Sequence, residues 1–120
     1  MRKWIFVLLA PVVLWAQIGS SGTLKGTVTD SSGAIVPGVV VVATHTLTGV
    51  ENRRETTASG LFVIAPLAPG NYQLTATANG FRRFIQENIV VDALSTLELS
   101  VKLEVGATTE SVTITGVQAE

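Results

Sequence analysis

The chain has 120 residues, of which 14% are charged, and its formal net charge is −1. A chain of this length has room for one small domain with a single core. The near-neutral charge provides no basic patch, so nucleic acid is not an expected partner. The sequence contains no cysteine, which excludes disulfides, thiolate nucleophiles and sulfur-ligated metals.

The N-terminus has the pattern of a secretory signal peptide. Arg2 and Lys3 precede an uncharged, mostly apolar run from Trp4 to Ala16. As a helix this run would span roughly 20 Å, which is short of the roughly 30 Å hydrocarbon core of a bilayer. We therefore predict a signal peptide and short linker over residues 1–22, with export to the periplasm or outer membrane. An uncleaved membrane anchor is the alternative.

The chain after residue 22 is a succession of β-prone runs separated by turn residues. Tyr72 to Ala78 and Leu97 to Glu104 alternate apolar and polar residues, as strands with one buried face do. Val39 to Thr44 is nearly all β-branched and predicts a central strand or one covered on both faces. Glu51 to Thr57 is polar and predicts an edge strand. The patterns predict an all-β fold, a small antiparallel β-sandwich of about seven strands.

Turns and core positions follow from the same patterns. Asp30 to Gly33 predicts a turn in which short polar side chains bond the backbone. Asn79-Gly80 predicts a tight turn, and Pro66 to Gly70 a stiff loop. The predicted core consists of inward-facing residues of the strands, namely Leu24, Val28, Val41, Phe62, Tyr72, Leu74, Leu97, Leu99 and Val101.

The side chains that catalysis needs are few. His45 is the single histidine, whereas a zinc peptidase needs three protein ligands and a serine triad needs a histidine base. His45 follows the apolar run 39–43 and is predicted to lie on the surface at a strand end. We therefore predict that the protein is not an enzyme and has no catalytic residue, metal site or cofactor.

Five motifs occur in the order and spacing of a known family. They are Gly26 to Asp30, Gly33 to Val39, Thr57 to Phe62, Leu67 to Tyr72 and Ala78 to Phe81. Over residues 23–104 the chain resembles the carboxypeptidase regulatory-like domain family. The resemblance implies a transthyretin-like (prealbumin-like) or immunoglobulin-like sandwich with a carbohydrate-binding-like fold. Such domains stand at the N-terminus of Oar-like TonB-dependent outer-membrane receptors, so the chain is expected to be the N-terminal domain or a truncated form of one.

Residues 105–120 form the predicted extended tail, which resembles the segment that follows this domain in Oar-like receptors. There Val112, Thr113, Ile114 and Thr115 are similar to the TonB box, an extended strand that pairs with an edge of TonB. The implied role is structural or protein-interacting in transport, and the implied partners are TonB or an outer-membrane receptor barrel. A further strand of the sandwich is the alternative for these four residues.

Carbohydrate binding is the alternative function, because the wider superfamily shares its sandwich with starch-binding modules. Those modules stack sugars on exposed aromatic rings, and Phe81, Arg82, Arg83 and Phe84 form the predicted carbohydrate contact. A bend whose rings turn into the core while its arginines reach the solvent is the other interpretation of these residues.

Overall fold

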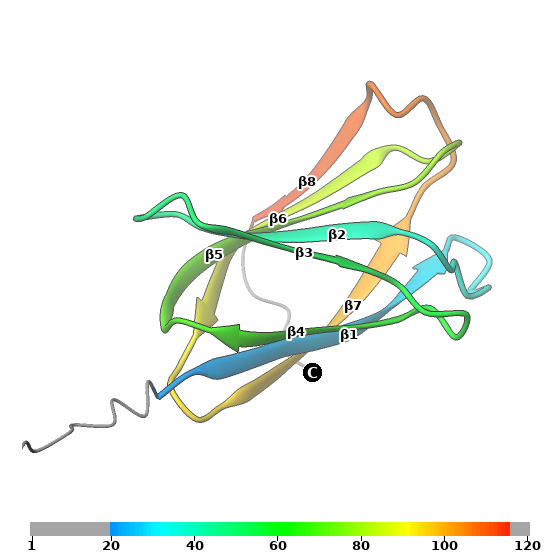
Figure 1. Ribbon diagram of the computed structural model, residues 1–120. Helices are drawn as coiled ribbons and strands as arrows, with labels where there is room; N and C mark the ends of the chain where they lie inside the picture. The colour runs from blue at the N-terminus through cyan, green and yellow to red at the C-terminus, as the bar shows by residue number, and fades with distance from the viewer. Residues whose placement is uncertain (1–19, 116–120) are drawn as a thin grey trace, which may run out of the picture.

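A computed structural model describes residues 20–115, which form eight strands in two sheets (Figure 1). The strands are β1 (Gly22–Asp30), β2 (Val40–His45), β3 (Glu51–Glu55), β4 (Leu61–Leu67), β5 (Gly70–Thr77), β6 (Arg83–Val91), β7 (Thr96–Leu103) and β8 (Ser111–Thr115). The order is β4-β1-β7 in one sheet and β3-β2-β5-β6-β8 in the other. The predicted all-β sandwich is confirmed. Residues 1–19 of the predicted signal peptide and linker (residues 1–22) lie outside the described residues.

The sheets are mixed rather than purely antiparallel. β1 pairs in parallel with β7, from Thr23 opposite Thr96 to Asp30 opposite Leu103, and β6 pairs in parallel with β8. The other strand pairs are antiparallel. The two parallel pairs differ from the predicted antiparallel arrangement, whereas eight strands agree with the predicted number of about seven. Alternation along one strand does not reveal its partner, and a parallel partner must be distant in sequence. Residues 20–115 contain no helix that is long and apolar enough to cross a membrane.

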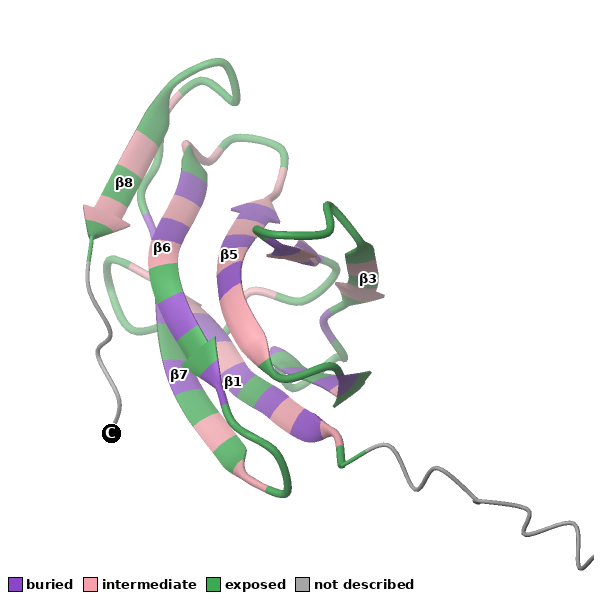
Figure 2. Ribbon diagram, turned by 90° about the vertical axis from the view of Figure 1, so that its left-hand side faces the viewer, coloured by how far each residue is buried: buried purple, intermediate pink, exposed green. Residues whose placement is uncertain are grey.

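The core lies between the two sheets and is built from alternate residues of the strands (Figure 2). Eight of the nine predicted core residues are buried there. The exception is Leu97, near the start of β7, which is only half-buried and packs against the core from its margin. Alternation correctly gives the face that Leu97 occupies, but it does not show where the facing sheet stops covering the strand.

The two predictions for β2 and β3 can be compared with their places in the sheet. β3 is an edge strand, as its charges predict, and β2 lies centrally between β3 and β5. Val41 and Ala43 of β2 are buried, whereas Val40 and Val42 on the other face are half-exposed. The β-branched run therefore marks a central strand that is covered on one face.

A buried polar contact at the end of β2 corrects the prediction for His45. This residue is 7% exposed, so the prediction of a surface position is wrong. Its ring lies edge-on to Tyr72, with 5.0 Å between ring centroids. Thr48 N donates to Nδ1 at 3.3 Å, so Nε2 carries the proton and donates to Pro69 O at 3.2 Å. Gly70 makes room for the ring, because a Cβ there would lie 2.3 Å from Nε2. Both ring nitrogens are thus used within the fold.

The turn predicted at Asp30 to Gly33 is organised by the Asp30 carboxylate. Its Oδ1 accepts hydrogen bonds from Ser32 Oγ at 2.6 Å, Ser32 N at 2.9 Å and Ala34 N at 3.0 Å. These bonds, that of the Ser32 hydroxyl first, hold the pKa of the Asp30 carboxyl below its usual value of 3.8.

We expect the Asp30 carboxyl carbon to titrate below pH 3.8 in a carbon-detected NMR titration. Because the folded-state pKa is below the unfolded one, the turn contributes stability above the usual pKa and loses it as pH falls through the folded-state pKa. Ser32→Ala removes the principal donor and should return the pKa of Asp30 toward 3.8. An unchanged pKa in this variant would show that the hydroxyl is not the cause.

Candidate functional site

The two predicted contact segments, distant in sequence, lie side by side in the five-stranded sheet. Residues 81–84 lead into β6, and residues 112–115 lie in β8. Because β6 and β8 pair in parallel, Phe84 is directly opposite Val112. We call the surface formed by residues 81–87 and 111–115 the β6–β8 edge (Figure 1). The candidate site is this edge.

β8 is the outermost strand of its sheet and is only partly covered. Its inward side chains, Val112 and Ile114, are half-buried, whereas Ser111, Thr113 and Thr115 are exposed. Figure 2 shows no buried residue along β8. Within residues 20–115, β8 pairs with β6 and with no other strand, so its second side has no strand partner there. An open strand side presents backbone donors and acceptors to a further strand. The predicted tail thus contains a strand of the sandwich, the alternative that the sequence left open.

The four residues of the predicted carbohydrate contact occupy different environments. Phe84 is 2% exposed and belongs to the core. Phe81 is half-buried against the core, and its backbone forms an isolated bridge with Val105. Arg82 is half-buried, and Arg83 alone of the four is exposed. The rings turn inward, as in the interpretation of a bend, and Phe84 offers no surface for stacking.

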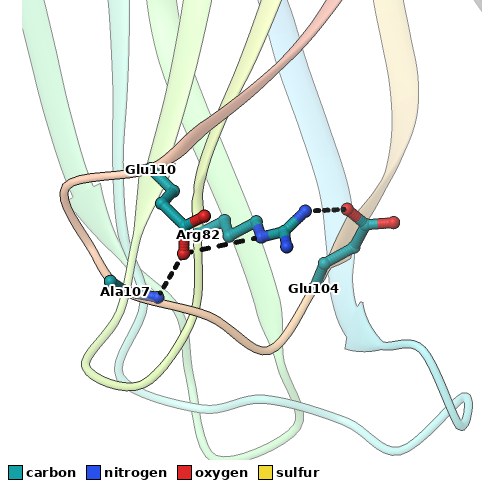
Figure 3. A network of polar contacts seen from close by, with 4 residues as sticks. All are labelled: Arg82, Glu104, Ala107 and Glu110. Atoms are coloured by element: carbon teal, nitrogen blue, oxygen red, sulfur yellow. Dashed lines mark hydrogen bonds and ion pairs between the residues drawn. The ribbon is translucent and has the colours of Figure 1, made fainter.

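Arg82 holds the segment between β7 and β8 (Figure 3). Its Nη1 lies 3.7 Å from Glu104 Oε2, and its Nε lies 3.9 Å from Glu110 Oε1. Glu110 Oε1 also accepts a hydrogen bond from Ala107 N at 3.0 Å. The charged side chains are 41–53% exposed, so each ion pair is worth at most about 1 kcal/mol. Sequence analysis missed this network, whose signal is a pair of glutamates at the two ends of the segment 104–110.

Gln86 is a buried polar residue at the junction of β6 and β8. It is 2% exposed and lies opposite Ile114 in the parallel pair. Its Nε2 is buried without a hydrogen-bond partner among the described residues. Such a group costs about 1–3 kcal/mol relative to a satisfied one. The Gln86 amide is therefore a destabilising group within β6.

A shallow depression on the outer face of the five-stranded sheet is a separate feature. Its volume is about 370 Å³, and its lining is Thr46, Asn71, Gln73, Glu87 and Asn88. Here β6 bulges, with two residues opposite Gln73, and Asn88 has a φ of 58°. The lining offers hydrogen-bonding groups but no aromatic ring. Within residues 20–115, no three His, Asp or Glu side chains are grouped so that they could hold a metal ion.

The two sheets and their strand order define a transthyretin-like β-sandwich. The family model of the carboxypeptidase regulatory-like domain matches residues 23–104. The chain belongs to this family, as the five motifs predict. β8 lies beyond the matched residues. No curated protein matches the chain.

Three solved structures illustrate the fold. The Bacillus anthracis TIE protein is 21% identical with a TM-score of 0.61, over 72% of this chain and 17% of that one. A candidate carbohydrate-binding protein from Bacteroides uniformis is 16% identical with a TM-score of 0.56, over 68% of this chain and 40% of that one. The 5-hydroxyisourate hydrolase of Klebsiella pneumoniae is 25% identical with a TM-score of 0.53, over 72% of this chain and 92% of that one. This chain therefore spans less than half of the first two proteins.

Proposed function

We propose that the protein is an exported, non-catalytic interaction module of a TonB-dependent outer-membrane receptor system. In this proposal the sandwich of residues 23–104 is the structural part, and Val112 to Thr115 contact TonB in the periplasm. The position of β8 supports the proposal most directly. It is an edge strand, it lies outside the family match, and its second side has no strand partner within residues 20–115.

Strand addition is the chemistry that this position suits. A strand of TonB would pair with the open side of β8 and continue the order β6-β8 by one strand. Backbone hydrogen bonds would supply most of the affinity, and the exposed Ser111, Thr113 and Thr115 would make small polar contacts. Their short side chains leave the backbone accessible.

Proline at the centre of β8 tests the proposal. Thr113→Pro removes a backbone donor and distorts the strand, so we expect TonB binding to weaken at least about tenfold, the equivalent of about one hydrogen bond. Isothermal titration calorimetry with the purified periplasmic domain of TonB provides the measurement. Thr113→Ala is the matched control and should bind like the unchanged chain, because it keeps every backbone group.

Two results would contradict the proposal. One is an unchanged chain that does not bind TonB at high micromolar concentration, and the other is equal binding by Thr113→Pro and Thr113→Ala. Amide NMR signals of Ile85 and Glu87, which lie opposite Thr113 and Thr115 in the β6–β8 pair, report separately on whether the proline variant still pairs within its own sheet.

A further inference from the structure

The core of the sandwich is formed without β8. Within residues 20–115, the 17 buried hydrophobic residues all lie between Leu24 and Leu103. β8 adds Val112 and Ile114, which are half-buried, and Ile114 alone of the two packs against the core cluster. The family match also ends before β8, at residue 104. β8 therefore contributes little to the core and packs against the edge of a sandwich whose core is formed by the other strands.

The side of β6 that β8 occupies fixes one register and one orientation. Five pairs join the strands in parallel, from Arg83 with Ser111 to Glu87 with Thr115. In this register Val112 and Ile114 face the core side, and the three hydroxyl-bearing residues face the solvent. A slip by one residue would reverse these faces and expose both apolar side chains. The side of β6 that faces β8 is thus suited to a parallel strand that has apolar residues at two alternate positions.

Apart from the five-pair ladder with β6, the contacts that keep β8 on its own sandwich are modest. Two ion pairs of half-exposed side chains join Arg82 to Glu104 and Glu110. Arg82 N donates to Glu104 O and Arg83 N donates to Glu110 O, each at 2.8 Å. Gln86, which lies opposite Ile114, has a buried Nε2 without a hydrogen-bond partner among the described residues. When residues 105–110 are released and extended, they reach roughly 20 Å from Glu104.

We propose that β6 is a strand-acceptor edge and that β8 of a second copy of this chain occupies it by exchange. The segment 111–115 has the register and face pattern that β6 pairs with, so β8 of a second copy can reproduce the β6–β8 pairing of the closed chain. Exchange therefore needs no new complementary surface. Its extent depends on protein concentration, because the chain's own β8 competes at an effective concentration in the millimolar range.

The absence of native cysteine allows a direct test on the full chain. Ile85 and Thr113 are opposite each other in the β6–β8 pair. One preparation carries Ile85→Cys and the other Thr113→Cys. The two are mixed at high concentration, incubated and oxidised. Strand exchange predicts a covalent dimer joined between positions 85 and 113, identified by mass spectrometry, at least about tenfold above random pairing.

Two matched controls make the result specific. Val42 lies on the outer face of β2, two strands from β6. The variant Val42→Cys should therefore form a mixed dimer with Thr113→Cys only at the random level. The double variant Ile85→Cys/Thr113→Cys, oxidised at low concentration, should close within one chain and remain monomeric at every concentration.

The proposal is overturned if the 85–113 dimer is no more abundant than the 42–113 dimer, or if the internally closed variant dimerises like the unlocked chain. TonB takes no part in the experiment. Failure here would leave the proposed contact with TonB standing, and failure of that contact would leave strand exchange standing.

Discussion

Replacing Gly26 with alanine is expected to lower the free energy of unfolding by about 3 kcal/mol, at the upper end of the usual cost of overpacking. Gly26 lies in β1, the central strand of the three-stranded sheet. A Cβ at this position would lie 2.2 Å from the Leu99 carbonyl oxygen and 2.7 Å from Phe62 Cζ. The oxygen belongs to the paired strand β7 and cannot withdraw without breaking the ladder. Urea denaturation provides the measurement.

Gly33→Ala is the matched control for this steric effect. Gly33 has a φ of 88°, but a Cβ there would meet nothing within 4 Å. Its cost should therefore be that of a left-handed backbone alone, about 1–2 kcal/mol. If Gly26→Ala is as mild as this control, the close approach of β1 to Phe62 and Leu99 does not constrain the fold.

Leu99→Ala is expected to lower the free energy of unfolding by about 2–5 kcal/mol, because it removes a buried side chain and leaves a cavity. Leu99 is 2% exposed in β7 and faces the core. A loss of this size is a large part of the stability of a small domain. Thermal and urea unfolding should both report it.

Leu97→Ala provides the comparison within the same strand. Leu97→Ala is the same substitution two residues earlier, where the side chain is only half-buried. Its loss should be clearly smaller, since fewer contacts and less apolar area are removed. Equal losses of unfolding free energy at the two positions, or no loss in Leu99→Ala, would show that the core does not end between Leu99 and Leu97.

The strands were predictable where the signal is local. The alternation in β5 and β7 identified both strands and their buried faces, and the charges of β3 identified an edge. At Asp30 the turn requires a short polar side chain that accepts backbone hydrogen bonds. At Gly80 the turn requires a positive φ. Each of these features depends on a few neighbouring residues, so the sequence contains it directly.

The remaining features depend on contacts between distant segments. Val112 to Thr115 was recognisable as β-prone, but its pairing with β6 was not, because every β-prone segment offers the same backbone groups. The burial of His45 depends on the loop before β5 closing over it. Likewise, Arg82 is a network residue only because the β7–β8 segment returns to it. No local sequence pattern reveals these contacts, because the residues that make them are far apart in the chain.

The parallel pairing of β1 with β7 has a mechanical consequence. The chain enters this pair at Gly22 and leaves it at Leu103, and these two points lie at opposite ends of the ladder. A pulling force between them acts along the strands, so the paired positions from Thr23 to Asp30 bear the load together in shear. By contrast, β5 and β6 pulled apart at Gly70 and Val91, which are opposite each other, would unzip one hydrogen bond at a time. The β1–β7 pair is therefore expected to resist a pull between Gly22 and Leu103 more strongly than β5 and β6 resist one between Gly70 and Val91.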